Sequence, residues 1–158
     1  MFATNSTPEW RVVAATRVAV ERDAETLAAL DAELREELGD AYSDEPWTVH
    51  EFLAERPGKW QLSRLVVTGG RPCGFWIASM ADADAHTHRV GISGPWRGRG
   101  LAAALAEHVH RAAHLAGARR MTMYVSPDNH VARAAYACLG YRPCTFSGRP
   151  AMERSLCE

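Results

Sequence analysis

The most constraining feature of this sequence is a glycine-rich loop between a short apolar segment and a long amphipathic helix. Residues 96–102 read WRGRGLA, and the strand-like run 90–92 stands just before them. Such a loop gathers free N–H donors and the positive end of a helix dipole around one point. Gly98 and Gly100 permit a tight turn and a close approach of a ligand, and Arg97 and Arg99 add positive charge. The loop therefore predicts a site for a phosphate or a pyrophosphate.

The helix after the loop is predicted from its apolar spacing, at Leu101, Leu105, Val109, Ala112 and Leu115. The glycine spacing does not by itself identify the phosphate compound. It excludes a Walker A loop, because Leu101 and Ala102 stand where Lys and Ser or Thr are needed. It also departs from Gly-x-Gly-x-x-Gly, since Ala103 occupies the last position.

A second motif lies downstream and reads Asn129-x-x-Ala132-x-x-x-Tyr136-x-x-x-Gly140-Tyr141. Asn129 and Tyr136 are two helical turns apart and therefore share a helix face. Gly140 stands where a glycine would end that helix.

Together, the two motifs resemble those of the GNAT (Gcn5-related N-acetyltransferase) family. The family's acyl-CoA signature, Arg/Gln-x-x-Gly-x-Gly/Ala, is matched by Arg97, Gly100 and Ala102. The resemblance runs from Arg64 to the C-terminus, while the first sixty residues match only in their pattern of elements. It implies an α+β fold with a central twisted mixed sheet of about six to seven strands and about four flanking helices. We expect one domain over residues 1–158, with residues 1–10 as a flexible tail.

The residue patterns predict a compatible order of elements. Strands are expected at 11–20, 62–67, 73–80, 86–92, 121–125, 141–146 and 151–156. A helix with Asp23 as its N-cap should extend to a stop at Gly39. A capping box of Thr48 and Glu51 should begin a helix that ends near residues 57–58. The long helix after the loop should end at Gly117, and residues 127–128 should open the last one.

Composition excludes several classes of function. A net charge of −1 and the lack of interleaved aromatic residues argue against nucleic acid as a partner. Without an eighteen-residue apolar run or a signal-peptide core, we expect a soluble cytoplasmic protein with no membrane contact. The four cysteines form no Cys-x-x-Cys pair and no zinc spacing, so no metal site is expected.

The charges are unevenly distributed, with twelve of the nineteen acidic residues between positions 21 and 55. This stretch is either a solvated acidic helix or an acidic wall that attracts cationic acceptors. Four aromatic residues in the same half are either core residues or walls of an acceptor pocket: Tyr42, Trp47, Phe52 and Trp60.

The resemblance implies acyl-CoA, most simply acetyl-CoA, as co-substrate. The implied contacts come from the strand before the loop, from the loop, and from the second motif. They are Ile92, Arg97, Gly98, Arg99, Gly100, Leu101, Ala102, Asn129, Ala132 and Tyr136. The alternatives are plain surface charge for Arg97 and Arg99 and an ordinary helix-start residue for Asn129.

The resemblance also implies that Tyr136 is the general acid. A phenol with a pKa of about 10 is protonated at neutral pH and can donate to a leaving thiolate; the alternative is a half-buried helix aromatic. The general base is open, because the Glu that some family members carry before the loop is absent. Asp84 and His86 are the candidates, since even-numbered residues would share the face of Ile92 on a regular strand. The alternative is a polar turn with histidines at the strand rim.

We therefore expect an acyl-CoA-dependent N-acyltransferase that transfers acetyl directly to a primary amine of a small molecule, such as an amino acid, polyamine, antibiotic or related metabolite. The alternatives are a protein or peptide acceptor, and a non-catalytic module that senses acyl-CoA. Dimers are common in the family, which makes a homodimer compatible with the resemblance. The helix histidines His108, His110 and His114 are expected to face solvent.

Overall fold

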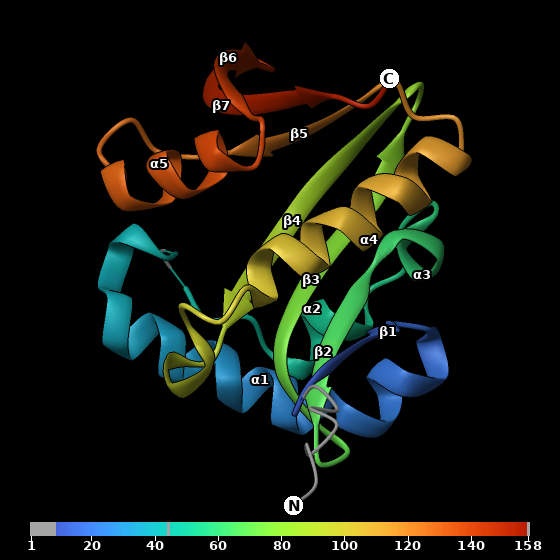
Figure 1. Cartoon of the computed structure of the whole chain (residues 1–158), viewed down its shortest axis with the longest axis vertical. Helices are drawn as coiled ribbons and strands as arrows, with labels where there is room; N and C mark the ends of the chain where they lie inside the picture. The colour runs from blue at the N-terminus through green and yellow to red at the C-terminus, as the bar shows by residue number, and fades with distance from the viewer. Residues whose placement is uncertain (1–8, 44, 158) are drawn as a thin grey trace, which may run out of the picture.

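Seven strands form one mixed sheet in the order β1-β2-β3-β4-β5-β7-β6 in the computed structural model, which describes residues 9–43 and 45–157. Figure 1 shows the sheet running through the centre of the molecule. Neighbouring strands are antiparallel except β4 and β5, which are parallel. The strands are β1 (Arg11–Ala14), β2 (Arg64–Thr68), β3 (Arg71–Ala81), β4 (Asp84–Ile92), β5 (Arg120–Tyr124), β6 (Arg142–Phe146) and β7 (Arg149–Ser155).

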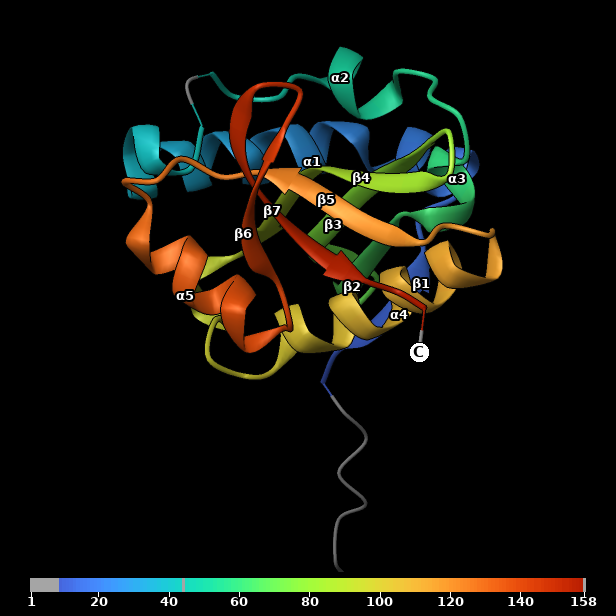
Figure 2. The ribbon, with the colours of Figure 1, turned by 90° about the horizontal axis from the view of Figure 1, so that it is seen from above.

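Helices cover both faces of this sheet, with α1 and α2 on one side and α4 and α5 on the other (Figure 2). The α-helices are α1 (Arg17–Leu38), α2 (Val49–Leu53), α3 (Lys59–Leu62), α4 (Leu101–Leu115) and α5 (His130–Cys138). Two single 3₁₀ turns, η1 (Gly39–Ala41) and η2 (Gly94–Trp96), follow α1 and β4. The predicted α+β class with a twisted mixed sheet is therefore confirmed.

Each face of the sheet has its own apolar core because strand side chains alternate between the two faces. Trp76, Leu105 and Met121 belong to the core on the α4 side, while Leu27 and Phe75 belong to the core on the α1 side. These residues are fully buried.

The start of α1 corrects one prediction. The strand ends at Ala14 instead of continuing to residue 20, and α1 begins at Arg17 with Thr16 as its N-cap instead of Asp23. The Thr16 hydroxyl accepts a hydrogen bond from the N–H of Ala19 at 3.2 Å. The Val and Ala residues of this stretch suit a strand by propensity, but burial of Val20 on the helix face decides the outcome.

The helix predicted from Thr48 is shorter than expected. The capping box is present, but α2 ends at Leu53, and a separate one-turn helix, α3, begins at Lys59. Gly58 has a φ of +70° and lies against Met80, so the chain turns there. The Lys59 ammonium reaches back to the carbonyls of Phe52 at 2.7 Å and Ala54 at 2.6 Å, which are left open at the end of α2. In the part of the chain described, no helix is both long enough and apolar enough to cross a membrane.

Candidate active site

The site lies where the parallel strands β4 and β5 separate. Their pairing ends at Thr87 and Met123, whereas β4 continues to Ile92 with β3 as its partner. Beyond Thr87, β4 therefore has one backbone edge without a strand neighbour. A ligand with amide groups can bind such an edge as an added strand would.

A β-bulge at His88 changes which β4 side chains face which layer. Thr87 pairs with Ala78, and Arg89 pairs with Ile77, so His88 is the extra residue. Val90 and Ile92 consequently pack in the core on the α4 side, while Arg89 bonds to a carboxylate of α1. The expectation that His86 and Asp84 share the face of Ile92 is therefore wrong, because it assumed a regular strand.

The glycine-rich loop turns at Gly98 and Gly100, as predicted. Gly98 and Gly100 have φ values of +75° and +85°, which side chains with a Cβ rarely adopt. From Gly98 to Ala103, no backbone N–H donates a hydrogen bond to another described residue. These N–H groups surround the N-terminus of α4, a 15-residue helix. The arrangement is suited to binding an anion.

This loop lines a largely apolar groove of about 710 Å³. The groove is lined by Val90 and Ile92 of β4, by the loop, and by Asn129, Ala132 and Tyr136 of the second motif. Nine of the ten residues predicted to contact the cofactor line it; the exception is Arg99. Free N–H groups at one end and apolar walls along the rest fit the pyrophosphate and the pantetheine arm of an acyl-CoA.

The two arginines of the loop have intramolecular partners. Arg97 binds the Glu37 carboxylate through two hydrogen bonds of 2.7 and 3.0 Å, and its Nε donates to the carbonyl of Ile92 at 3.1 Å. The bond from Arg97 lowers the pKa of Glu37 below its usual value. Arg99 lies over the Trp96 ring at 4.8 Å and pairs with Glu9 at 3.4 Å.

Tyr136 and Asn129, from the second motif, both line the groove. Asn129 caps α5 by accepting the N–H of Ala132 at 3.1 Å, and its side-chain amide donates to the carbonyl of Ala41. Among the described residues, none forms a hydrogen bond with the Tyr136 hydroxyl. Burial raises the pKa of Tyr136 to about 12. At neutral pH this phenol is therefore protonated and available as a donor.

A second cavity, of about 510 Å³, adjoins the groove. Six residues line both cavities, and the predicted acid Tyr136 is one of them, together with Val90 and Asn129. The second cavity also includes His88 of β4 and Arg149 of β7. Two cavities that share a wall containing a phenol can bind two substrates next to the same residue.

A buried ion pair supports the wall of the second cavity. Asp31 of α1 is fully buried, and its carboxylate accepts two hydrogen bonds from Arg89, at 2.9 and 2.7 Å. The Tyr42 hydroxyl donates to it at 2.6 Å and the Trp47 backbone N–H at 2.5 Å. Neither Asp31 nor Arg89 was among the functional residues predicted from the sequence. The available signal was an acid on the leucine-rich face of α1, between Leu27 and Leu34.

The aromatic residues of this half divide between the two expected roles. Phe52 is fully buried and contacts Phe75, so it is a core residue. Tyr42 lines both cavities. Trp47 packs on Phe52 and below the Arg89 guanidinium, and Trp60 donates to Glu55.

His86 and Asp84 are not brought together with Tyr136. His86 hydrogen-bonds to Thr122 at 2.8 Å and stacks on Phe146, and it contacts His88, which does line the second cavity. Burial, followed by the charges of Arg56 and Arg149, lowers the pKa of His86, so its imidazole is neutral at pH 7.

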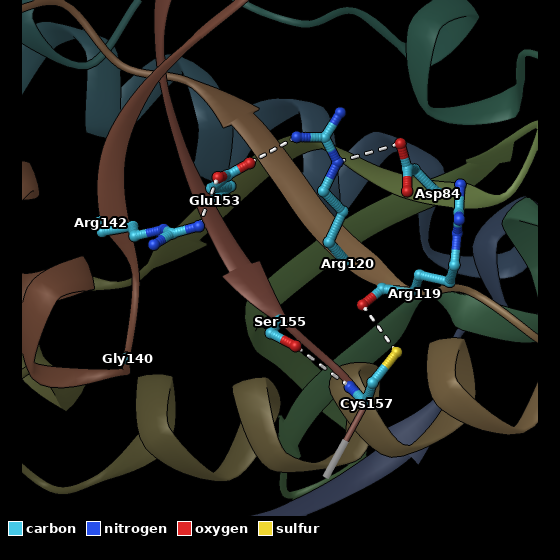
Figure 3. Close-up of a pocket in the computed structure, with 8 residues that line it drawn as sticks. All are labelled: Asp84, Arg119, Arg120, Gly140, Arg142, Glu153, Ser155 and Cys157. Atoms are coloured by element: carbon cyan, nitrogen blue, oxygen red, sulfur yellow. Dashed lines mark hydrogen bonds and ion pairs between the residues drawn. The ribbon is translucent and has the colours of Figure 1, made fainter.

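Asp84 lies in a separate cavity with Arg119 and Cys157, shown in Figure 3. Arg120 donates to Asp84 at 3.0 Å and also binds Glu153, so the Asp84 carboxylate belongs to a charged network at the other end of β4.

His110 was predicted to face solvent, and this prediction is wrong. It is buried on α4 and hydrogen-bonds to the Tyr141 hydroxyl at 2.6 Å and to Arg154. Burial, together with the charge of Arg154, lowers the pKa of His110 to about 3. Its position beside Ala106 and Ala113 on the apolar helix face was a signal for burial.

The sequence matches the model of a known protein family. The model of the acetyltransferase (GNAT) family matches residues 26–141. Mycothiol acetyltransferase of Corynebacterium glutamicum strain R is 34% identical over 102 residues, which are 60% of this chain and 34% of that protein. The match thus spans about a third of the length of the curated relatives.

Solved structures agree with the fold. The ribosomal-protein-S18-alanine N-acetyltransferase from Escherichia coli has a TM-score of 0.68 at 18% identity, covering 93% of this chain and 94% of that one. The PaiA N-acetyltransferase from Thermoplasma acidophilum, in complex with coenzyme A, has a TM-score of 0.70 at 15% identity, covering 92% and 98%. At these identities the likeness shows the fold alone. By the family match over most of its length, the chain belongs to the acetyltransferase (GNAT) family.

Proposed function

We propose that this chain transfers an acyl group, most simply acetyl, directly from acyl-CoA to a primary amine of a small molecule. The observation that supports this is that Tyr136 lines both cavities. The groove with free N–H groups suits the acyl-CoA, and the adjoining cavity suits an amine of modest size. The acyl carbon and the amine nitrogen would then meet beside the phenol.

The loop and the strand edge hold the donor in this proposal. N–H groups from Gly98 to Ala103 bind the pyrophosphate, and the open edge of β4 near Ile92 pairs with pantetheine amides. Arg97 would exchange Glu37 for a phosphate oxygen, since both are anionic partners for the same guanidinium. Asn129 holds the start of α5, and with it Tyr136, in position.

Tyr136 acts as the general acid. Attack of the uncharged amine forms the new C–N bond, the nitrogen gives one proton to the general base, and the C–S bond breaks as the sulfur takes its electron pair. The Tyr136 hydroxyl then gives its proton to that sulfur, and the phenolate recovers a proton from solvent. A pKa of about 12 keeps the donor protonated across the physiological range.

For the general base, the contacts favour His86 over Asp84. His86 is neutral at pH 7 and adjoins His88 on the cavity wall, whereas Asp84 is held by Arg120 elsewhere. His86→Gln should therefore slow acetyl transfer more than Asp84→Asn does, and the opposite order would assign the proton acceptor to Asp84.

Calorimetric titration with acetyl-CoA, followed by an amine panel that detects release of free CoA thiol, tests the proposal. Binding with turnover of a small amine would support it. Turnover of peptide amines alone would favour a protein acceptor. Binding without turnover on any amine would favour a sensing role, and no binding at all would refute the proposed donor site.

A further inference from the structure

The charged residues that line the second cavity differ in whether they have an ion-pair partner within the protein. Its charged lining residues in the described structure are Asp40, Arg89 and Arg149. Asp40 is exposed and pairs with Arg35 at 3.6 Å. Arg89 donates to the Asp31 carboxylate through Nε and Nη2, and Nη2 also donates to the Ser43 hydroxyl and the carbonyl of Glu45. The charges of Asp40 and Arg89 are therefore each balanced by an ion pair within the protein.

Arg149 is different because no acidic residue of the described chain pairs with it. Its guanidinium lies over the Tyr124 ring, 4.0 Å from the centroid. A ring contact on the face of a guanidinium leaves its N–H donors in the plane free to bind a planar anion. By contrast, Arg97, Arg99, Arg120 and Arg142 all have carboxylate partners.

The backbone fixes where Arg149 stands. It is the first residue of β7 and pairs with Phe146 across a two-residue turn. Ser147 and Gly148 of this turn have φ values of +49° and +75°, as a tight hairpin turn with matching twist requires. Phe146 in turn contacts both Tyr124 and His86. Arg149 is exposed, and its guanidinium therefore lies at the edge of an aromatic cluster formed by Tyr124, Phe146 and His86.

Positive charge predominates around the two histidines beside this cavity. Burial and the charges of Arg56, His86 and Lys59 lower the pKa of His88 to about 3. The charge of Arg149 contributes to lowering the pKa of His86. Of the described acids between positions 21 and 55, Asp40 alone lines this cavity. This distribution of charge does not favour the alternative in which an acidic wall attracts cationic acceptors. They favour an acceptor whose reacting amine is uncharged and whose remainder is anionic.

We propose that Arg149 binds a carboxylate of the acceptor, so that the substrates are small amines that also carry a carboxylate, as amino acids do. This inference rests on the acyl transfer proposed above and specifies its acceptor. A carboxylate accepts two parallel hydrogen bonds from the guanidinium fork, and a cavity of about 510 Å³ has room for a molecule of this size. Arg149 would then act as a specificity residue, without a part in proton transfer.

The test uses matched pairs of acceptors with the full-length protein. Each α-, β- and ω-amino acid is assayed beside its primary amide, and kcat/KM is measured by CoA thiol release. For each protein, kcat/KM for the acid is divided by kcat/KM for the amide. This acid-to-amide ratio is then compared between the parent protein and each variant. The different basicities of the two amines cancel in this comparison, because they are the same for both proteins.

We expect Arg149→Gln to lower the acid-to-amide ratio by about ten- to a hundredfold, the range of a hydrogen-bonded charge. Arg149→Lys should retain part of the ratio, because an ammonium keeps the charge but loses the fork. Arg142→Gln is the matched control, since Arg142 is exposed and lines the separate cavity of Figure 3. Its ratio should not change. Acetyl-CoA affinity, measured by calorimetry, should stay constant in all three variants.

An unchanged ratio in Arg149→Gln overturns the inference and leaves the proposed acyltransferase intact. The same holds if polyamines or other amines without a carboxylate are acetylated and no amino acid is. Failure to acetylate any amine, with or without a carboxylate, overturns the proposed function and this inference with it.

Discussion

Asp31→Asn should destabilise the protein strongly, although the substitution keeps the shape of the side chain. The carboxylate is fully buried and accepts four hydrogen bonds, two of them from Arg89, whose side chain is 12% exposed. An Asn would aim an NH₂ group at these donors and leave the Arg89 charge buried without its partner. Removing one member of a buried pair costs about 3–5 kcal/mol.

Urea unfolding followed by circular dichroism measures this loss. With a slope of about 1–3 kcal/mol per molar urea, the midpoint should fall by roughly 1–5 M at an unchanged slope. Because the network also holds Tyr42 and Trp47, the KM for the amine acceptor should rise in the variant. Asp40→Asn is the matched control, since Asp40 is 89% exposed and should change stability by less than about 0.5 kcal/mol. A loss below about 1 kcal/mol for Asp31→Asn would show that the buried pair does not support this wall.

Three further predictions concern the donor site and the α4 core. Tyr136→Phe should lower kcat by about 10²–10⁴-fold with little change in acetyl-CoA affinity, and an unaffected rate would remove Tyr136 as the acid. Arg97→Ala should raise the KM for acetyl-CoA by about tenfold or more and that of the acceptor much less; equal effects would count against the loop as the pyrophosphate site. His110 is neutral in the folded state, because its pKa of about 3 lies below the unfolded value of about 6.5. The unfolded state therefore binds the extra proton between these values, and stability should fall as the pH drops from about 6.5 to 3. His110→Gln should flatten that slope by up to about 1.4 kcal/mol per pH unit, and an unchanged slope would mean that His110 titrates normally.

Much of the fold and of the donor groove could be predicted from local patterns. The free N–H groups after Gly98, the cap at Asn129 and the capping box at Thr48 depend on residues within a few positions of one another. Short-range hydrogen bonds and helical spacing determine such features, and both are visible in the sequence. The boundaries near Asp23 and residue 57 were harder to place, because burial against distant residues overrides local preference.

The residues around the second cavity could not be placed without the tertiary structure. The bulge at His88 depends on how β4 pairs with β3, and it reverses the face of every side chain after it. Asp31 and Arg89 are 58 positions apart, and neither residue type is expected in a core until its partner is known.

Residues that are neighbours along the chain were sufficient to predict the family resemblance, the approximate order of strands and helices, and the loop that suits an acyl-CoA. Contacts between distant residues were needed to show that Tyr136 lines two cavities and that Arg149, from the last strand, lines the second. The same kind of contact buries His110 and draws Asp84 into another ion-pair network. The physical reason is that the charge state and accessibility of a side chain depend on its neighbours in space, and these come from strands that are far apart along the chain.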